Sequence, residues 1–174
     1  MNSFKTRQLV IDAMLAAICA VLGYLAFSSN NLKVSFEGFP VIIAALLFGP
    51  VSGGLVGFVG IFIYQVVRYG LMLSTPMWVL PYVVSGVFLG VVAKKKDFNL
   101  SKKDYWIYII ANELLVSVIN SIGVFIDGHA FGYYTPQSYA ISTLIRFAIA
   151  LLKAVLYVQI LPPIINTLKK LKQR

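Results

Sequence analysis

The stretch KKKDFNLSKK, from Lys94 to Lys103, decides the fold because it is a cationic break in the middle of an otherwise apolar chain. Two further groups of cations lie near the chain ends: Lys5 and Arg7 at the beginning, and Lys169, Lys170, Lys172 and Arg174 at the end. Cationic segments that flank membrane spans stay in the cytoplasm. If all three groups are cytoplasmic, an even number of spans separates each group from the next.

The composition indicates an integral membrane protein. Of the 174 residues, 59% are hydrophobic and only 12% are charged, and the mean hydropathy is +0.84. A soluble domain has roughly 45–50% apolar and about 25% charged residues. The net charge is +9. The cations flank apolar runs and form no basic stripe with interleaved aromatics, so they favour contact with anionic lipid headgroups over binding of nucleic acid.

The apolar runs predict six helices in a single domain that covers residues 1–174. A span needs about 20 apolar residues. The six runs are Leu9–Phe27, Phe39–Phe48, Val51–Leu73, Met77–Ala93, Tyr105–Phe125 and Ser138–Ile165. The second is short for a crossing and is stopped by Gly49 and Pro50. We therefore predict an all-α integral membrane protein of the cell membrane, a six-transmembrane-helix bundle with cytoplasmic N and C termini.

Four cations stand outside the three basic groups: Lys33, Arg68, Arg146 and Lys153. A charge inside a span costs at least about 2.5 kcal/mol and persists with a partner, water or a function. Arg68 shares a helix face with Gln65 and is followed by Tyr69. It either snorkels to the outer interface or donates to a carboxylate or a heteroaromatic edge of a ligand. Arg146 is a ligand candidate near the outer leaflet.

The two lysines have candidate partners within the chain. Lys153 lies near mid-span, where Glu113 or Asn120 is its expected partner. Lys33 either contacts the substrate or forms a solvated pair with Glu37, which lies close by in the sequence.

Aromatic residues gather toward the predicted outer side, where they form an interfacial belt or stack on a flat ligand. Trp78, beside Pro76 at a helix start, is the preferred stacking residue. The full candidate substrate-binding set is Lys33, Phe36, Gln65, Arg68, Tyr69, Trp78, Tyr82, Asn120, Tyr133 and Arg146. One histidine, His129, and one cysteine, Cys19, form no metal-ligand spacing, so we predict no metal, no cofactor and no catalytic set.

Small residues recur four apart in the first apolar run, at Ala13, Ala16, Ala17 and Ala20. This spacing places them in line, so that another helix can pack closely there. The partner helix belongs either to the same bundle or to a second protein.

Three features together resemble the S component, the substrate-binding subunit, of energy-coupling factor (ECF) transporters for vitamins. They are the alanine motif, the segment KVSFEGFP from Lys33 to Pro40 followed by AALLFGPVSGG from Ala44 to Gly54, and a last helix that carries Arg146 and Lys153 before a basic tail. The last feature is similar to the folate branch. STPMWVLP, from Ser74 to Pro81, stands where that branch has Pro-Gly-Phe-Thr.

The resemblance implies a function. The chain would capture a vitamin at the outer face and deliver it with a transmembrane coupling subunit, which docks on the alanine motif, and two ATPases. Folate, with carboxylates and a ring system, is the first candidate; pantothenate and a pyridoxine-type vitamin are alternatives. An ion-gradient-driven secondary transporter is the alternative from another class, and an intramembrane enzyme would need paired catalytic groups at one depth.

Overall fold

The computed structural model describes residues 3–29 and 32–173. These residues form six helices: α1 (Ser3–Tyr24), α2 (Gly38–Phe48), α3 (Pro50–Tyr69), α4 (Thr75–Lys95), α5 (Lys102–Ala130) and α6 (Pro136–Gln173). Five of them are long and apolar enough to cross a membrane, and α2 is the shorter sixth. The predicted six-helix architecture is confirmed, and the helix ends mostly extend a few residues beyond the apolar runs.

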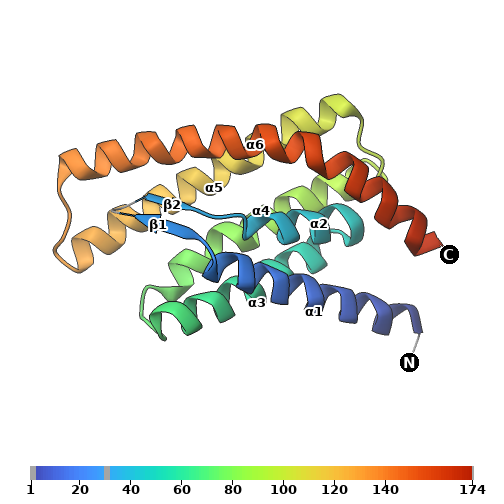
Figure 1. Cartoon of the computed structure of the whole chain (residues 1–174), viewed down its shortest axis with the longest axis horizontal. Coiled ribbons are helices and arrows are strands. Elements are labelled where there is room, and N and C mark those ends of the chain that lie inside the picture. Colours follow the sequence, from blue (N-terminus) through green and yellow to red (C-terminus); the bar gives the residue numbers. More distant parts are fainter. Residues whose placement is uncertain (1–2, 30–31, 174) are drawn as a thin grey trace.

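The three basic segments lie at one end of the bundle. Figure 1 shows the start of α1, the end of α6 and the α4–α5 connection together on the right of the view. The α3–α4 and α5–α6 connections lie at the other end. We call these the basic end and the opposite end. This arrangement is the one that an even number of crossings between cationic segments requires.

A short β-hairpin follows α1 at the opposite end. Strand β1 (Phe27–Ser29) pairs antiparallel with β2 (Leu32–Val34), and Phe27 faces Val34 across the ladder. The sequence suggested only a polar loop for this segment, because two three-residue strands are too short to show alternation. The pairing satisfies backbone N–H and C=O groups of the two strands.

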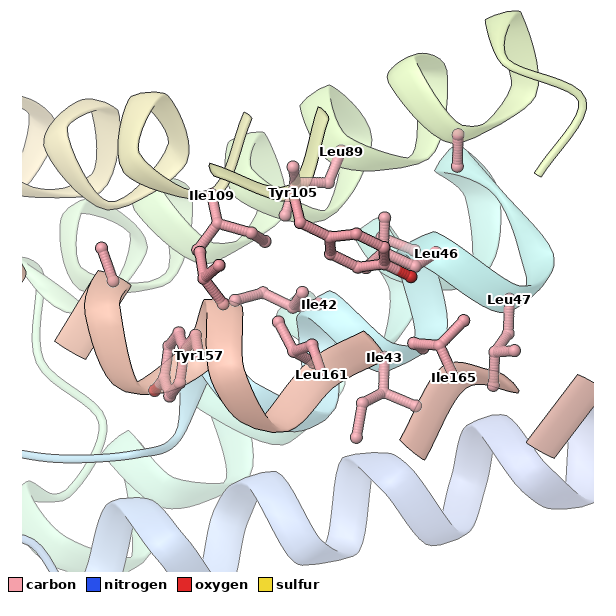
Figure 2. Close-up of a cluster of buried hydrophobic side chains, with 14 residues drawn as sticks. Ile42, Ile43, Leu46, Leu47, Leu89, Tyr105, Ile109, Tyr157, Leu161 and Ile165 are labelled. Atoms are coloured by element: carbon pink, nitrogen blue, oxygen red, sulfur yellow. The ribbon is translucent and has the colours of Figure 1, made fainter. Parts of the chain in front are cut away.

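Helix α2 lies inside the bundle. Its eight consecutive residues from Pro40 to Leu47 are all buried, and it packs against α1, α3, α4 and α6. Figure 2 shows Ile42 and Leu46 among apolar side chains of the other helices, including Ile109 of α5 and Leu161 of α6. A helix that is apolar on every face is expected to be enclosed in this way.

Glycines bring α3 and α4 into close contact. A Cβ atom on Gly53 would lie 2.6 Å from the carbonyl oxygen of Gly86, and one on Gly86 would lie 2.2 Å from that of Gly53. One turn further, a Cβ on Gly57 would lie 2.6 Å from the Tyr82 carbonyl oxygen. Any side chain at these positions would push the two backbones apart. Glycines allow this close approach of two helix backbones in a membrane protein.

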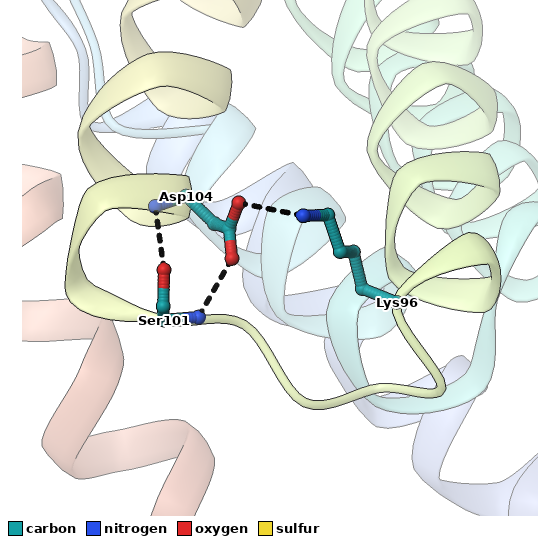
Figure 3. A network of polar contacts seen from close by, with 3 residues as sticks. All are labelled: Lys96, Ser101 and Asp104. Atoms are coloured by element: carbon teal, nitrogen blue, oxygen red, sulfur yellow. Dashed lines mark hydrogen bonds and ion pairs between the residues drawn. The ribbon is translucent and has the colours of Figure 1, made fainter.

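The α4–α5 connection is fixed by polar contacts at the basic end (Figure 3). Ser101 and Asp104 form a capping box: the Ser101 N–H donates to Asp104 Oδ2 at 2.9 Å, and the Asp104 N–H donates to Ser101 Oγ at 3.2 Å. The Lys96 ammonium lies 3.1 Å from Asp104 Oδ1. Lys169 of α6 donates to the Phe98 carbonyl, so the connection is also tied to the last helix.

Candidate functional site

Two adjoining cavities lie in the half of the bundle near the opposite end. The deep chamber has a volume of about 130 Å3, and the outer cavity has a volume of about 770 Å3. Gln65, Trp78, Ser142 and Arg146 line both, so the two share a wall. The outer cavity alone falls within the range of roughly 300–1,000 Å3 that is typical of small-molecule sites.

The deep chamber is polar, and Glu37 is the acidic residue among its described lining residues. Glu37 immediately precedes α2 and is only 1% exposed. The Tyr82 hydroxyl donates to Glu37 Oε1, and the Cys19 thiol donates to the Glu37 carbonyl oxygen at 3.1 Å. The alternative of a solvated pair between Lys33 and Glu37 is therefore wrong about Glu37, whose side chain is buried in the bundle directly before α2.

Lys153 of α6 also lines the deep chamber. Its ammonium lies 3.0 Å from Glu113 Oε2 of α5, and the two side chains are 16% and 4% exposed. Of the two partners predicted for Lys153, Glu113 and Asn120, the structure shows the ion pair with Glu113. An ammonium group has three donors, so this ion pair leaves N–H groups of Lys153 for a molecule in the chamber.

Arg146 stands at the junction of the two cavities. Its Nη1 donates to Ser121 Oγ at 3.1 Å. Within residues 3–29 and 32–173, no carboxylate forms an ion pair with this guanidinium. A cation held away from water needs a counter-charge, and the planar guanidinium suits a carboxylate. The junction is therefore suited to an anionic group.

Seven aromatic residues are among those that line the outer cavity. Its rings are those of Tyr64, Tyr69, Trp78, Phe131, Tyr133, Tyr134 and Tyr139. Asp127 is the acidic residue of its lining, and it accepts a hydrogen bond at Oδ2 from the Tyr133 hydroxyl. Burial and this bond raise the pKa of Tyr133 to about 12. The phenol therefore stays neutral and keeps donating at physiological pH.

A polar chamber below an aromatic cavity, inside a six-helix membrane bundle, has the layout of a small-molecule carrier. A family model described as "ECF transporter, substrate-specific component" matches residues 7–168. The chain belongs to this family. It is thus a multi-pass membrane protein and the substrate-specific component of a transporter.

Sequence relatives of this ECF component are UPF0397 proteins. One from Exiguobacterium sp. is 32% identical over 93 residues, which are 52% of this chain and 48% of that protein. One from Streptococcus thermophilus is 24% identical over 140 residues, which are 78% of this chain and 71% of that protein. The chain thus aligns with about half of the first protein's length and more of the second's.

Solved structures of ECF S components share the fold. The S component of a bacterial ECF transporter aligns with a TM-score of 0.70 at 19% identity, over 95% of this chain and 99% of that one. An S component for biotin gives 0.71 at 16% identity, over 98% and 94%. FolT bound with folic acid gives 0.62 at 23% identity, over 88% and 94%. At these identities the likeness concerns the fold alone.

Seven of the ten residues predicted to bind substrate in this ECF component line the cavities. Gln65, Trp78 and Arg146 line both, Tyr82 and Asn120 line the deep chamber, and Tyr69 and Tyr133 line the outer cavity. The structure brings these seven together from four helices and the α5–α6 connection. Their role in binding stays a prediction.

Three other predicted residues are placed differently. Phe36 lines neither cavity and packs edge-on against Tyr157, with ring centroids 6.4 Å apart. Arg68 also lies outside both linings; its Nη1 donates to the Tyr24 carbonyl oxygen at 2.9 Å. The side chain of Lys33 lies outside the described part of the structure.

Sequence reasoning missed several lining residues, among them Ser35, Glu37, Ser117, Asp127 and Ser142. The sequence did contain a signal for Glu37. It directly precedes an entirely apolar helix, and a helix of this kind is enclosed by the bundle together with the residue at its start. Serines carry no comparable signal, because they are common in membrane helices.

The alanine motif of α1 is divided between two environments. Ala13 and Ala17 are exposed, whereas Ala16 is 5% exposed and Ala20 is partly buried. A Cβ on Gly60 of α3 would lie 2.9 Å from the Ala16 carbonyl oxygen, so Ala16 serves packing within the bundle. Ala13 and Ala17 remain available to a partner helix, and the docking role predicted for the motif stays a prediction.

Proposed function

We propose that this S component captures a vitamin that carries an anionic group and a flat ring, with folate as the first candidate. The observation that carries the proposal is Arg146, which faces both cavities and has no carboxylate partner in the described residues. A ligand carboxylate would supply the missing counter-charge through two parallel N–H···O bonds.

The ring is supported by the aromatic lining of the outer cavity. Aromatic side chains favour offset-stacked or edge-on contact with a flat ligand. Trp78 lies where the cavities adjoin, so a ring beside it would stand close to Arg146. The deep chamber, at about 130 Å3, is smaller than typical small-molecule sites, so a vitamin would occupy both spaces.

Comparison of the candidate vitamins favours folate. Folate has carboxylates for Arg146 and a bicyclic ring for the aromatic cavity. Pantothenate has the carboxylate without the ring, and a pyridoxine-type vitamin has the ring without the carboxylate.

Delivery to the cytoplasm would require a transmembrane coupling subunit and two ATPases, because the chain has no GxxxxGK phosphate-binding loop of its own. The two exposed alanines of α1, Ala13 and Ala17, support a docking surface for the coupling subunit. Small residues let two helix backbones approach closely in a membrane.

The test is native mass spectrometry of the gently purified protein, followed by calorimetric titration with folic acid, biotin, pantothenate and pyridoxine. We expect one vitamin molecule per chain and the tightest binding for folic acid. Tightest binding of another vitamin would replace folate and keep the capture function. Binding of none, together with ion-gradient-driven uptake by the chain alone in proteoliposomes, would contradict the proposal.

A further inference from the structure

The outer cavity and the deep chamber differ in charge. Among the described residues, the wall of the deep chamber carries the cations Arg146 and Lys153 and the carboxylate of Glu37. The charged residues described in the outer lining are Arg146, at the shared junction, and Asp127, away from it. A ligand that reaches from the outer cavity to the junction therefore meets the Asp127 carboxylate and the Arg146 cation.

Asp127 has one oxygen in use and one without a partner. Oδ2 accepts a hydrogen bond from the Tyr133 hydroxyl. Oδ1 is buried and has no hydrogen-bond partner in the described part of the chain. A buried carboxylate oxygen is costly unless it accepts a hydrogen bond. The residue is thus held in place by Tyr133 while it still needs a donor.

Aromatic residues from two parts of the chain line the same cavity as this carboxylate. Tyr133 and Tyr134 come from the α5–α6 connection, and their backbone N–H groups both donate to the Gly128 carbonyl oxygen at 3.1 Å. Tyr64 and Tyr69 come from α3, and their hydroxyls lie 3.3 Å apart. A flat group that reaches Asp127 would therefore have rings to stack on.

We propose that Asp127 binds the amino-substituted edge of a flat nitrogen heterocycle, while Arg146 binds a carboxylate of the same molecule. A ring N–H beside an exocyclic amino group presents two parallel donors, which match a carboxylate as a guanidinium does. The ligand lies with its ring toward the opposite end and its acid group inward. The inference rests on the proposed function and narrows the substrate to carboxylate-bearing amino-heterocycles, a class that includes aminopteridines and excludes biotin and pantothenate.

The first test uses the wild-type protein, so no variant has to fold. Calorimetry compares folic acid with 2-desamino-2-methylfolic acid, which lacks the amino donor and keeps the carboxylates. We expect the analogue to bind at least about tenfold more weakly, because a hydrogen bond to a charged group is lost. Equal affinities, as expected if a water molecule satisfies Oδ1, would overturn the inference.

The second test uses Asp127→Asn, which keeps the size and an acceptor for Tyr133 but removes the charge. We expect about a tenfold loss of affinity for folic acid and a clearly smaller loss for the analogue, which keeps only the ring N–H as a donor to residue 127. Asp97→Asn is the matched control, because Asp97 is exposed at the basic end and its loss changes the net charge equally. An equal effect of Asp127→Asn on both ligands would overturn the inference.

The outcomes for the two proposals differ. If the wild-type protein binds biotin or pantothenate but binds neither folic acid nor its 2-methyl analogue, the inference about Asp127 falls and vitamin capture stands. If it binds no vitamin, both fall.

Discussion

The Lys153 ammonium of α6 lies 3.0 Å from Glu113 Oε2 of α5. Both helices are long and apolar enough to cross the membrane, so each charge depends on the other for compensation. The pair stabilises the contact of the two helices and places Lys153 on the wall of the deep chamber.

Breaking this pair should destabilise the protein. Lys153→Met leaves Glu113 buried without its cation and should lower the free energy of unfolding by about 3–5 kcal/mol. Adding Glu113→Gln should restore most of the loss, because no uncompensated charge remains. Thermal unfolding of the detergent-solubilised protein measures both. A double variant as unstable as the single one would contradict the compensation argument.

Replacing Arg146 should affect ligand binding more than folding. Arg146→Gln should lower the affinity for folic acid at least about tenfold, since a charged hydrogen bond is worth about 1.5–3 kcal/mol. Arg146→Lys should retain part of the affinity, because it keeps the charge but loses the bidentate fork. Calorimetry provides the measurement. Unchanged affinity in a well-folded Arg146→Gln protein would remove Arg146 from the site.

Arg68 should prove to be structural. Its bond to the Tyr24 carbonyl satisfies an acceptor in the last turn of α1, which lacks an intrahelical donor. We expect Arg68→Ala to lower stability by about 0.5–1.5 kcal/mol and to change vitamin affinity less than about threefold. Parallel melting and calorimetry separate the two effects. A tenfold loss of affinity without loss of stability would instead support the binding role that the sequence suggested.

The contact of α3 with α4 should not tolerate a side chain. Gly86→Ala places a methyl group against the Gly53 backbone and should destabilise the protein by about 1–3 kcal/mol, as overpacking does. Gly123→Ala is the control: its added Cβ would lie 3.9 Å from the nearest atom, the Met77 carbonyl oxygen, and alanine favours helix. Thermal unfolding should therefore separate the two variants, and equal behaviour would argue against the close approach.

The two halves of the alanine motif should behave differently. Replacing Ala13 and Ala17 with Leu should leave vitamin binding intact and reduce recovery of the complex with a coupling subunit in co-purification. Ala16→Leu should instead lower stability, because Ala16 is buried against α3. Normal complex recovery with leucine at both exposed positions would count against docking through α1.

The architecture followed from the sequence because membrane burial imposes simple rules. Apolar run length and cation placement predicted six helices, and the cost of a buried charge predicted the Lys153–Glu113 pair. Glu37 and Asp127 were missed as cavity-lining residues because their positions depend on where α2 begins and on how far α5 continues beyond Phe125, to Ala130. The placement of Arg68 depended on the Tyr24 carbonyl, an acceptor that no sequence pattern displays.

The short length of α2 bears on how the size of the binding cavity can change during evolution. Eleven residues rise only about 16 Å, roughly half of the ~30 Å hydrocarbon thickness. The enclosed helix therefore fills the middle of the bundle near the basic end and leaves the remainder hollow, with Glu37 at the boundary. Insertion or deletion of one turn before Gly38 would shrink or enlarge that hollow without changing the outer helices. A single indel there could re-size the compartment for a different cargo while leaving the lipid-facing surface as it is.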